Sequence, residues 1–417
     1  MLFIIKIIQA VNGVTTVNRI ILAILLIITL SACIKQPEES EPVKIEPKDN
    51  SIKLSYEDEM LASLTLKEKI GQLVILGFSN DISEEELNNY IKVDKVSGFI
   101  LFSRNYKNFK ELYALNHKLK SLNINNPLPL FISIDEEGGT VSRLPKEITK
   151  IPDPFYFGSL DDVKLTEESG TIIGKQLCAA GVNLNFAPVL DILSNKKNKL
   201  FLKRSYGKDA ETVSRHGIAF IKGLTSQGII PTAKHYPGHG DTYSDSHKTL
   251  PTINIDYNTL INRELIPFKA AINEGIDAIM IGHLLFPQID DKPATKSGVL
   301  IEGILRRDLG FHGIALTDDI EMKGFIEGEQ TIEEAVIESF NADIDIFVIA
   351  HTSEIQNKVL KALLHAVLEG TITNERLNKS LKRIIMIKQK YKLSDNMNIS
   401  YEEAFRLINN NKLEISK

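Results

Sequence analysis

The chain has 417 residues, of which 43% are hydrophobic and 25% are charged, and its formal net charge at pH 7 is -5. This composition is that of an ordinary globular protein, and the length allows one large core or two smaller ones. The slight acidic excess offers no electrostatic support for binding nucleic acid, so we exclude that class of function.

The N-terminal segment, residues 1–33, differs from the rest of the chain. Residues 20–30 are apolar except for Thr29, Arg19 precedes them, and the sequence Leu-Ser-Ala-Cys closes the segment at Cys33. The run is too short for the roughly 20 residues of a transmembrane helix, but it has the pattern of a secretory signal. Its end resembles a bacterial lipobox, in which Cys33 becomes the lipid-modified first residue of the mature protein. A cleaved signal with an incidental cysteine is the alternative.

Cysteine usage gives no sign of a disulfide framework. Cys178 is the only cysteine besides Cys33, so the mature domain cannot form an internal disulfide if Cys33 carries lipid. We expect Cys178 to be a small residue of the core.

Residues 34–56 contain three prolines among glutamates and lysines. Such a composition cannot bury a core, so we expect an extended tether ahead of the folded domain. The predicted organisation is a signal over 1–33, a tether over 34–56, a folded domain over 57–393 and a C-terminal tail over 394–417.

From residue 57 onward, short β-type apolar runs alternate with amphipathic segments of helical length, which is typical of a parallel α/β protein. Eight runs are expected to form strands, and they span 73–78, 97–103, 128–135, 182–192, 229–237, 277–286, 313–319 and 345–351. Eight such strands predict an α/β fold of the TIM type, a (β/α)8 barrel with its functional site at the C-terminal strand ends. A doubly wound open sheet is the alternative, but the turn after the first run lacks the glycine-rich phosphate motif.

Polar side chains gather where these runs end, as a barrel site requires. The residues are Asp135 and Glu136 at the end of the third run, Asp191 in the fourth, Lys234 and His235 in the fifth, His283 in the sixth, and Asp318 and Asp319 in the seventh. We therefore expect them to face one shared pocket.

Residues 234–251 read KHYPGHGDTYSDSHKTLP, a polar loop with fixed bends. His247 is the candidate general acid and base, because imidazole titrates near pH 6.5. In an extended loop, residues two apart point to the same side, so the carboxylate of Asp245 is expected to orient the ring of His247 and raise its basicity. Taken alone, this triplet is more often a solvated surface loop.

The alternative is that this loop binds zinc. It contains side chains of the types that bind zinc, namely His235, His239 and His247 with Asp241 or Asp245. The spacing, however, matches no closed zinc motif. We therefore expect no metal.

Asp318 follows an apolar run, and it is the candidate nucleophile for glycoside hydrolysis with retention of configuration. Asp319 fits better as the N-cap of a following helix. Sugar hydroxyls need charged donors and acceptors at fixed positions, and the candidates for that role are Asp135, Arg143, Arg204, Lys234 and His235. Each of these, taken alone, could be an ordinary salt-bridge or capping residue.

Three segments carry a family resemblance: IDEEGGTVSRLP over 134–145, the loop over 234–251, and LTDDIEM over 316–322. They resemble the glycoside hydrolase family 3 β-N-acetylhexosaminidases of bacterial cell wall turnover, and the resemblance extends over about residues 57–393. Two parts of the chain depart from the family pattern. Glu136 and Thr140 stand where the family commonly has glutamine and arginine, and residues 192–203 lack the asparagine and proline pattern that the family usually has before the arginine at position 204.

The resemblance implies a role for each candidate residue. Asp318 would form a covalent glycosyl intermediate, and His247, assisted by Asp245, would be the general acid and base. The terminal sugar would be bound by Asp135, Arg143, Arg204, Lys234 and His235. The family uses neither metal nor cofactor.

We therefore expect a monomeric, extracytoplasmic enzyme anchored in a membrane by lipid at Cys33. Its predicted reaction is the hydrolysis of terminal β-linked N-acetylglucosamine from peptidoglycan fragments. A family 3 β-glucosidase or an N-acetylglucosaminide phosphorylase is the alternative among enzymes. A surface solute-binding lipoprotein, which would have two lobes built on open sheets, is the alternative among binding proteins.

Overall fold

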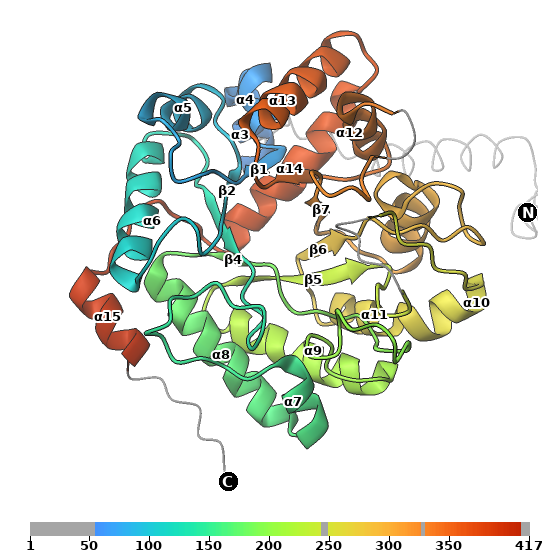
Figure 1. Cartoon of the computed structure of the whole chain (residues 1–417). Coiled ribbons are helices and arrows are strands. Elements are labelled where there is room, and N and C mark those ends of the chain that lie inside the picture. The colour runs from blue at the N-terminus through green and yellow to red at the C-terminus, as the bar shows by residue number, and fades with distance from the viewer. Residues whose placement is uncertain (1–54, 243–248, 327–329, 410–417) are drawn as a thin grey trace, which may run out of the picture. The chain divides into compact units, whose positions relative to one another are not determined.

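The structure is a computed structural model, and it describes residues 55–242, 249–326 and 330–409. Eight parallel strands close into a barrel in chain order, β1 to β8, which confirms the predicted (β/α)8 fold (Figure 1). The strands are β1 (Val74–Leu76), β2 (Gly98–Leu101), β3 (Phe131–Ile134), β4 (Leu184–Asn185), β5 (Ile230–Tyr236), β6 (Ala278–Ile281), β7 (Ile314–Asp319) and β8 (Ile346–Ile349). A closed barrel is neither a doubly wound open sheet nor the two-lobed structure of a solute-binding protein.

Each predicted run contains one strand, and the strands are shorter than the runs. The largest difference is at β4, where the run over 182–192 yields only Leu184–Asn185. Pro188 has no N–H to donate, so the regular ladder cannot continue through it. The chain stays beside β5 nevertheless, because Lys234 N donates to the Pro188 carbonyl and Leu190 N donates to the Lys234 carbonyl.

The helices surround the strands, as Figure 1 shows. They are α3 (Tyr56–Ser63), α4 (Leu66–Gly71), α5 (Glu84–Asn88), α6 (Phe109–Asn123), α7 (Pro154–Leu160), α8 (Val163–Ala180), α9 (Ala210–Thr225), α10 (Tyr257–Thr259), α11 (Ile266–Asn273), α12 (Ile332–Asn341), α13 (Ser353–Leu368), α14 (Asn374–Lys390) and α15 (Tyr401–Asn409). Short π-helical stretches η2 (Asn89–Val93), η3 (Leu260–Glu264) and η5 (Val299–Asp308) and a 3₁₀ turn η4 (Ala294–Lys296) complete the connections.

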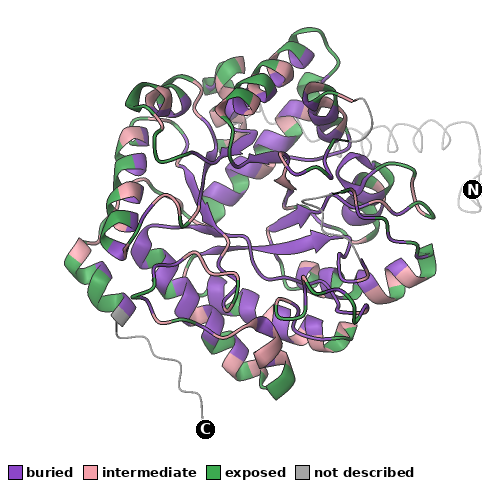
Figure 2. Cartoon of the chain, in the orientation of Figure 1, coloured by how far each residue is buried: buried purple, intermediate pink, exposed green. Residues whose placement is uncertain are grey.

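The core lies in and around the barrel wall. Every residue of β1, β2, β3, β5, β6 and β8 is buried, and the outer faces of the helices are exposed (Figure 2). Parallel strands covered by helices are buried on both faces, so they read as continuous apolar runs. This burial explains why the strands could be located from the sequence without an alternating pattern.

Cys178 is exposed on α8, so the prediction that it is a core residue is wrong. Lys175, three residues earlier, is exposed as well. Residues three apart lie on the same helix face, and this face of α8 points to solvent.

None of the helices in the described ranges has the length and apolar character needed to cross a bilayer. The predicted signal, Cys33 and nearly all of the predicted tether fall within residues 1–54, which lie outside the described residues. The lipid anchor therefore remains a prediction.

Candidate active site

A pocket of about 300 Å³ opens at the C-terminal ends of the strands. This is the small end of the range for ligand sites in proteins. The pocket is lined, among others, by all five predicted sugar contacts and by the predicted nucleophile, namely Asp135, Arg143, Arg204, Lys234, His235 and Asp318. Asp245 and His247 lie outside the described residues, so their predicted roles stay predictions.

Asp318 lies at the end of β7, where the buried strand meets the pocket. The preceding residue fixes the strand end, since Val348 N on β8 donates to Thr317 Oγ1 at 3.1 Å. One oxygen of Asp318 accepts from Asp319 N at 2.8 Å, and the other lies 4.0 Å from His235 Nε2. Burial alone would raise the pKa of Asp318, but its electrostatic interactions with neighbouring side chains, His235 first, outweigh burial and lower that pKa. Asp318 is therefore ionised at neutral pH, as a nucleophile must be.

His235 is oriented by Asp191. Asp191 Oδ2 lies 2.7 Å from His235 Nδ1, and the same carboxylate accepts the backbone N–H groups of His235 and of His239, the latter at 2.6 Å. Burial would raise the pKa of Asp191, but the adjacent His235 outweighs it and the pKa is lowered. An ionised carboxylate only accepts, so Nδ1 carries a proton and Nε2 is the nitrogen that faces Asp318.

Four charged side chains that line the pocket form a connected network. Lys234 Nζ lies 2.7 Å from Asp135 and 2.8 Å from Glu137. Arg204 donates to both oxygens of Glu137, with Nε at 2.8 Å and a terminal nitrogen at 2.7 Å. Burial would raise the pKa of Glu137, but Arg204 and then Lys234 outweigh it and hold that pKa far below its ordinary value. Lys234 remains an ammonium, since Asp135 and Glu137 more than offset burial and raise its pKa.

Glu137 lines the pocket, but the sequence prediction did not include it. Its position offered a signal, because Asp135 and Glu137 are two residues apart at a strand end and so point to the same side. The carboxylate of Glu137 is fully buried and sets the directions of Lys234 and Arg204.

Arg143 is positioned by the neighbouring Glu136. A single oxygen of Glu136 accepts from Ser142 Oγ at 3.0 Å, Arg143 N at 2.8 Å and Leu144 N at 3.1 Å. Burial raises the pKa of Glu136 to about 7. Arg143 Nε is buried and has no hydrogen-bond partner within the described chain. The Arg143 side chain lines the pocket, so it has a donor left for a ligand.

Asp319 does not cap a helix, so that expectation is wrong. The next helix in the described ranges, α12, begins at Ile332, and Thr331 caps it. Asp319 Oδ1 instead accepts from Ala350 N at 3.1 Å and Glu321 N at 3.2 Å. A carboxylate at this position ties the end of β7 to the end of β8.

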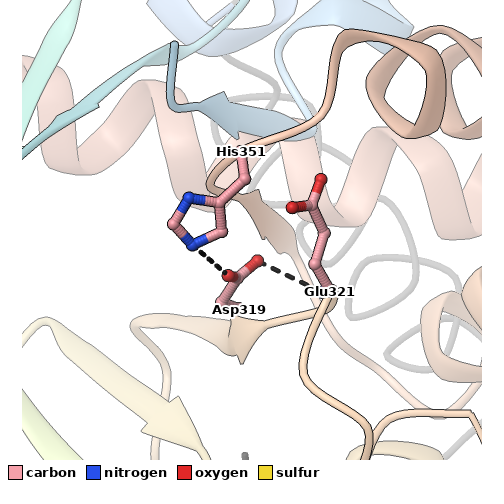
Figure 3. Close-up of side chains that lie close together, drawn as sticks. All are labelled: Asp319, Glu321 and His351. Carbon is pink, nitrogen blue, oxygen red and sulfur yellow. Dashed lines mark hydrogen bonds and ion pairs between the residues drawn. The ribbon is translucent and has the colours of Figure 1, made fainter. Parts of the chain in front are cut away.

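Asp319, Glu321 and His351 lie together beside this junction (Figure 3), and one ligand atom from each falls within 4.8 Å of the others. His351 Nε2 lies 3.3 Å from Asp319 Oδ2. Glu321 accepts from Thr352 N at 2.7 Å, and its other oxygen accepts from Thr352 Oγ1 at 3.3 Å. These side chains are of types that bind a divalent cation, but hydrogen bonds to backbone and hydroxyl groups already account for the positions of both carboxylates.

Of the residues in the zinc alternative, the structure describes His235, His239 and Asp241, and each of these has a protein partner. Besides the pair of His235 with Asp191, Arg263 donates to Asp241 at 2.8 Å, and His239 Nδ1 lies 2.9 Å from Thr242 Oγ1. Within the described residues they do not form a cluster able to share one ion.

A closed barrel with an ionised carboxylate at the end of β7, facing a pocket of paired cations and carboxylates, has the arrangement of a glycosidase. Residues 65–387 match the family described as the glycosyl hydrolase family 3 N terminal domain. The chain therefore belongs to glycosyl hydrolase family 3, and it is an enzyme of the glycosidase type.

Individual relatives agree with this membership. Beta-hexosaminidase from Glaesserella parasuis is 37% identical over 251 residues, which cover 60% of this chain and 72% of the relative. Beta-hexosaminidase A from Pseudoalteromonas piscicida is 30% identical over 369 residues, or 78% of this chain, and the match spans only 61% of that relative. The solved structure of a family 3 β-N-acetylglucosaminidase from Paenibacillus is 38% identical with a TM-score of 0.77, covering 83% of this chain and 68% of the other.

Proposed function

We propose that the protein is a retaining exo-β-N-acetylglucosaminidase that removes terminal β-linked N-acetylglucosamine through a covalent intermediate on Asp318. The observation that carries this proposal is the ionised Asp318 in a pocket that is also lined by charged side chains able to form hydrogen bonds with a sugar. The relatives named β-hexosaminidase and β-N-acetylglucosaminidase support the choice of sugar.

In the first step, an oxygen of Asp318 forms a bond to the anomeric carbon while the bond from that carbon to the leaving oxygen breaks. The protonated ring of His247 gives its proton to the leaving oxygen, and Asp245 orients the ring. In the second step, the neutral ring takes a proton from water, the water oxygen bonds to the anomeric carbon, and Asp318 leaves as a carboxylate. Two inversions give a product of retained configuration.

The charged network is suited to holding the sugar hydroxyls. Asp135 offers acceptors, while Lys234 and Arg204 offer donors whose directions Glu137 fixes. Arg143 adds a donor that is free within the described chain, and His235 lies next to Asp318. Fixed donors and acceptors align the anomeric carbon with the attacking oxygen without reorganisation during the reaction.

We further propose that the substrates are peptidoglycan fragments and that lipid on Cys33 holds the enzyme, as a monomer, on a membrane outside the cytoplasm. The apolar segment that ends in Leu-Ser-Ala-Cys supports the location. An enzyme placed there meets cell wall glycans that carry N-acetylglucosamine.

Paired substrates test the reaction. Purified enzyme is assayed with an aryl N-acetylglucosaminide and the matching aryl glucoside, each with and without phosphate. We expect faster hydrolysis of the N-acetylglucosaminide and no dependence on phosphate. Faster turnover of the glucoside would support the β-glucosidase alternative, and formation of a sugar phosphate would support the phosphorylase alternative.

The covalent step is tested by trapping. A 2-deoxy-2-fluoro or 5-fluoro glycosyl fluoride should inactivate the enzyme with one label per molecule, and peptide mapping should locate the label on Asp318. Label on Asp319, or inactivation without label, would refute the assigned nucleophile.

A further inference from the structure

The segment Gly238–Thr242, called the loop base below, is the last described part of the chain before residues 243–248. His247 belongs to those residues, so the position of the loop base decides where the chain sets out toward the proposed general acid. Most of the loop base is buried. On one side it contacts the segment Asp191–Asn198, which follows β4.

Asn198 makes the densest set of contacts with the loop base. Its side-chain amide nitrogen donates to His239 O at 3.3 Å, to Gly240 O at 3.2 Å and to Thr242 Oγ1 at 3.2 Å. Its oxygen accepts from Leu200 N at 3.1 Å, which locks the amide in this orientation. An amide nitrogen has two hydrogens, so one of them is shared between two of the three acceptors.

Asn195 adds a parallel contact. Its amide nitrogen donates to Thr242 O at 3.2 Å, and its oxygen accepts from Lys197 N at 3.0 Å. Both asparagines are buried, with exposed fractions of 9% for Asn195 and 4% for Asn198. Neither lines the pocket. Their side chains therefore serve the loop base and not a ligand.

The packing leaves the loop base little freedom on this side. A Cβ added to Gly240 would lie 1.7 Å from Ile192 O, so the two backbones are in direct contact. On another side, Arg263 donates to Asp241 at 2.8 Å and also to Glu264. The loop base is thus held from two directions, and the two asparagines donate hydrogen bonds to Thr242 at its C-terminal end.

We propose that Asn198, with Asn195, is a positioning residue for the general acid, because it fixes the backbone from which the His247 segment departs. This inference rests on the proposed role of His247. A general acid must be within hydrogen-bond reach of the leaving oxygen, and a shift of about 1 Å can cost about 10²-fold in rate. Loss of the Asn198 bonds therefore affects the proton transfer more than the binding of the terminal sugar.

The test uses Asn198→Ala and two substrates that differ only in the leaving group. With a disaccharide, whose leaving group needs the proton, kcat should fall about 10- to 100-fold while KM changes by less than about 2-fold. With an activated aryl N-acetylglucosaminide, the release of the phenol in the first turnover should slow by less than about 3-fold. An equal loss on both substrates would overturn the proposal.

Asn116→Ala is the matched control. Asn116 is fully buried on α6 and donates to Ala180 O at 2.7 Å, at the opposite end of the barrel from the pocket. The control should lose thermal stability to a similar degree and keep its kcat on both substrates. A selective loss on the disaccharide in Asn116→Ala would show that lowered stability alone causes the effect, and it would also overturn the proposal.

A double-mutant cycle separates this inference from the proposed function. If Asn198 acts through His247, Asn198→Ala should slow the His247→Ala enzyme by less than about 2-fold more, since the transfer it supports is already absent. If Asn198→Ala slows the His247→Ala enzyme by the same factor as it slows the parent enzyme, Asn198 does not act through His247, and only this inference fails. If His247→Ala itself slows both substrates equally, the acid assignment fails and the inference fails with it.

Asn195→Ala takes the place of Asn198→Ala if the latter does not fold. It removes the single bond to Thr242 O and should slow the disaccharide about 3- to 10-fold with the same leaving-group pattern. A uniform loss on both substrates in this variant would equally overturn the proposal.

Discussion

Replacement of Glu137 by glutamine should both destabilise the barrel and weaken substrate binding. The carboxylate of Glu137 is 1% exposed, and its partners Arg204 and Lys234 are 14% and 3% exposed. Glutamine can keep one acceptor oxygen, but its amide nitrogen must then face an N–H of Arg204, where a 2.8 Å or 2.7 Å bond existed. Lys234 would keep Asp135 as its ion-pair partner, and Arg204 would lose the carboxylate that accepts both of its hydrogen bonds.

The expected magnitude follows from the burial of this network. Removal of one partner from a buried ion pair costs about 3–5 kcal/mol, because the remaining charge is left desolvated. The entropy of unfolding for about 350 residues is about 0.7 kcal/mol per degree, so a loss of about 3–5 kcal/mol in stability corresponds to a decrease in Tm of about 4–7 °C. Glu354→Gln, on an exposed helix face, should change Tm by less than about 1 °C and serves as the control.

The effect should also have a defined pH dependence. Burial would raise the pKa of Glu137, but Arg204 and Lys234 hold it far below the ordinary value. A carboxyl with a lowered pKa stabilises the fold above the unfolded pKa of about 4.3, and this stabilisation is lost as the pH falls through the folded pKa. The difference in Tm between parent and variant should therefore be constant from pH 8 to pH 5.

Thermal unfolding followed by circular dichroism measures the stability, and initial rates on an aryl N-acetylglucosaminide measure KM. We expect KM to rise as well, because Lys234 and Arg204 lose the group that orients them. A Tm within 1 °C of the parent together with an unchanged KM would refute the reasoning on Glu137.

Four further outcomes are expected. Asp318→Asn should still fold but lose nearly all turnover, because an amide cannot attack the anomeric carbon. Asp319→Asn should keep more activity and lower Tm, since Asp319 ties β7 to β8. His247→Ala should slow hydrolysis of a disaccharide by about 10² to 10⁴-fold, show a burst of phenol with an activated aryl substrate, and be rescued by azide with formation of the β-glycosyl azide. Cys33→Ala should move activity out of the membrane fraction, and an unchanged distribution on cell fractionation would contradict lipidation. Burial raises the pKa of Glu136 to about 7, so its contribution to stability decreases as the pH rises from about 4 to about 7; the Tm of Glu136→Gln relative to the parent should accordingly be higher at pH 8 than at pH 5.

The amino-acid sequence by itself determined the barrel and the general location of its site. Strands buried on both faces are continuous apolar runs, and in a parallel barrel all their C-terminal ends meet on one face. Local patterns were therefore enough to find all eight strands and to predict that Asp135, Lys234, His235 and Asp318 share one pocket, where the structure places them. The same expectation is wrong for Glu136, Asp191 and His283, which are buried and do not line the pocket.

Only the tertiary structure decided how these groups act on one another. Glu137 joins Arg204 and Lys234 although 67 residues separate Glu137 from Arg204, and Asp191 orients His235 from 44 residues away. No local sequence pattern predicts such partners, because the pairing depends on how segments far apart in the chain are placed relative to one another at the strand ends. The same holds for Asn198, whose amide meets the loop base only after the two segments pack together. A local rule predicted that Asp319 caps a helix. A carboxylate binds the nearest backbone N–H groups, and for Asp319 these belong to Ala350 after β8 and to Glu321 in the following turn.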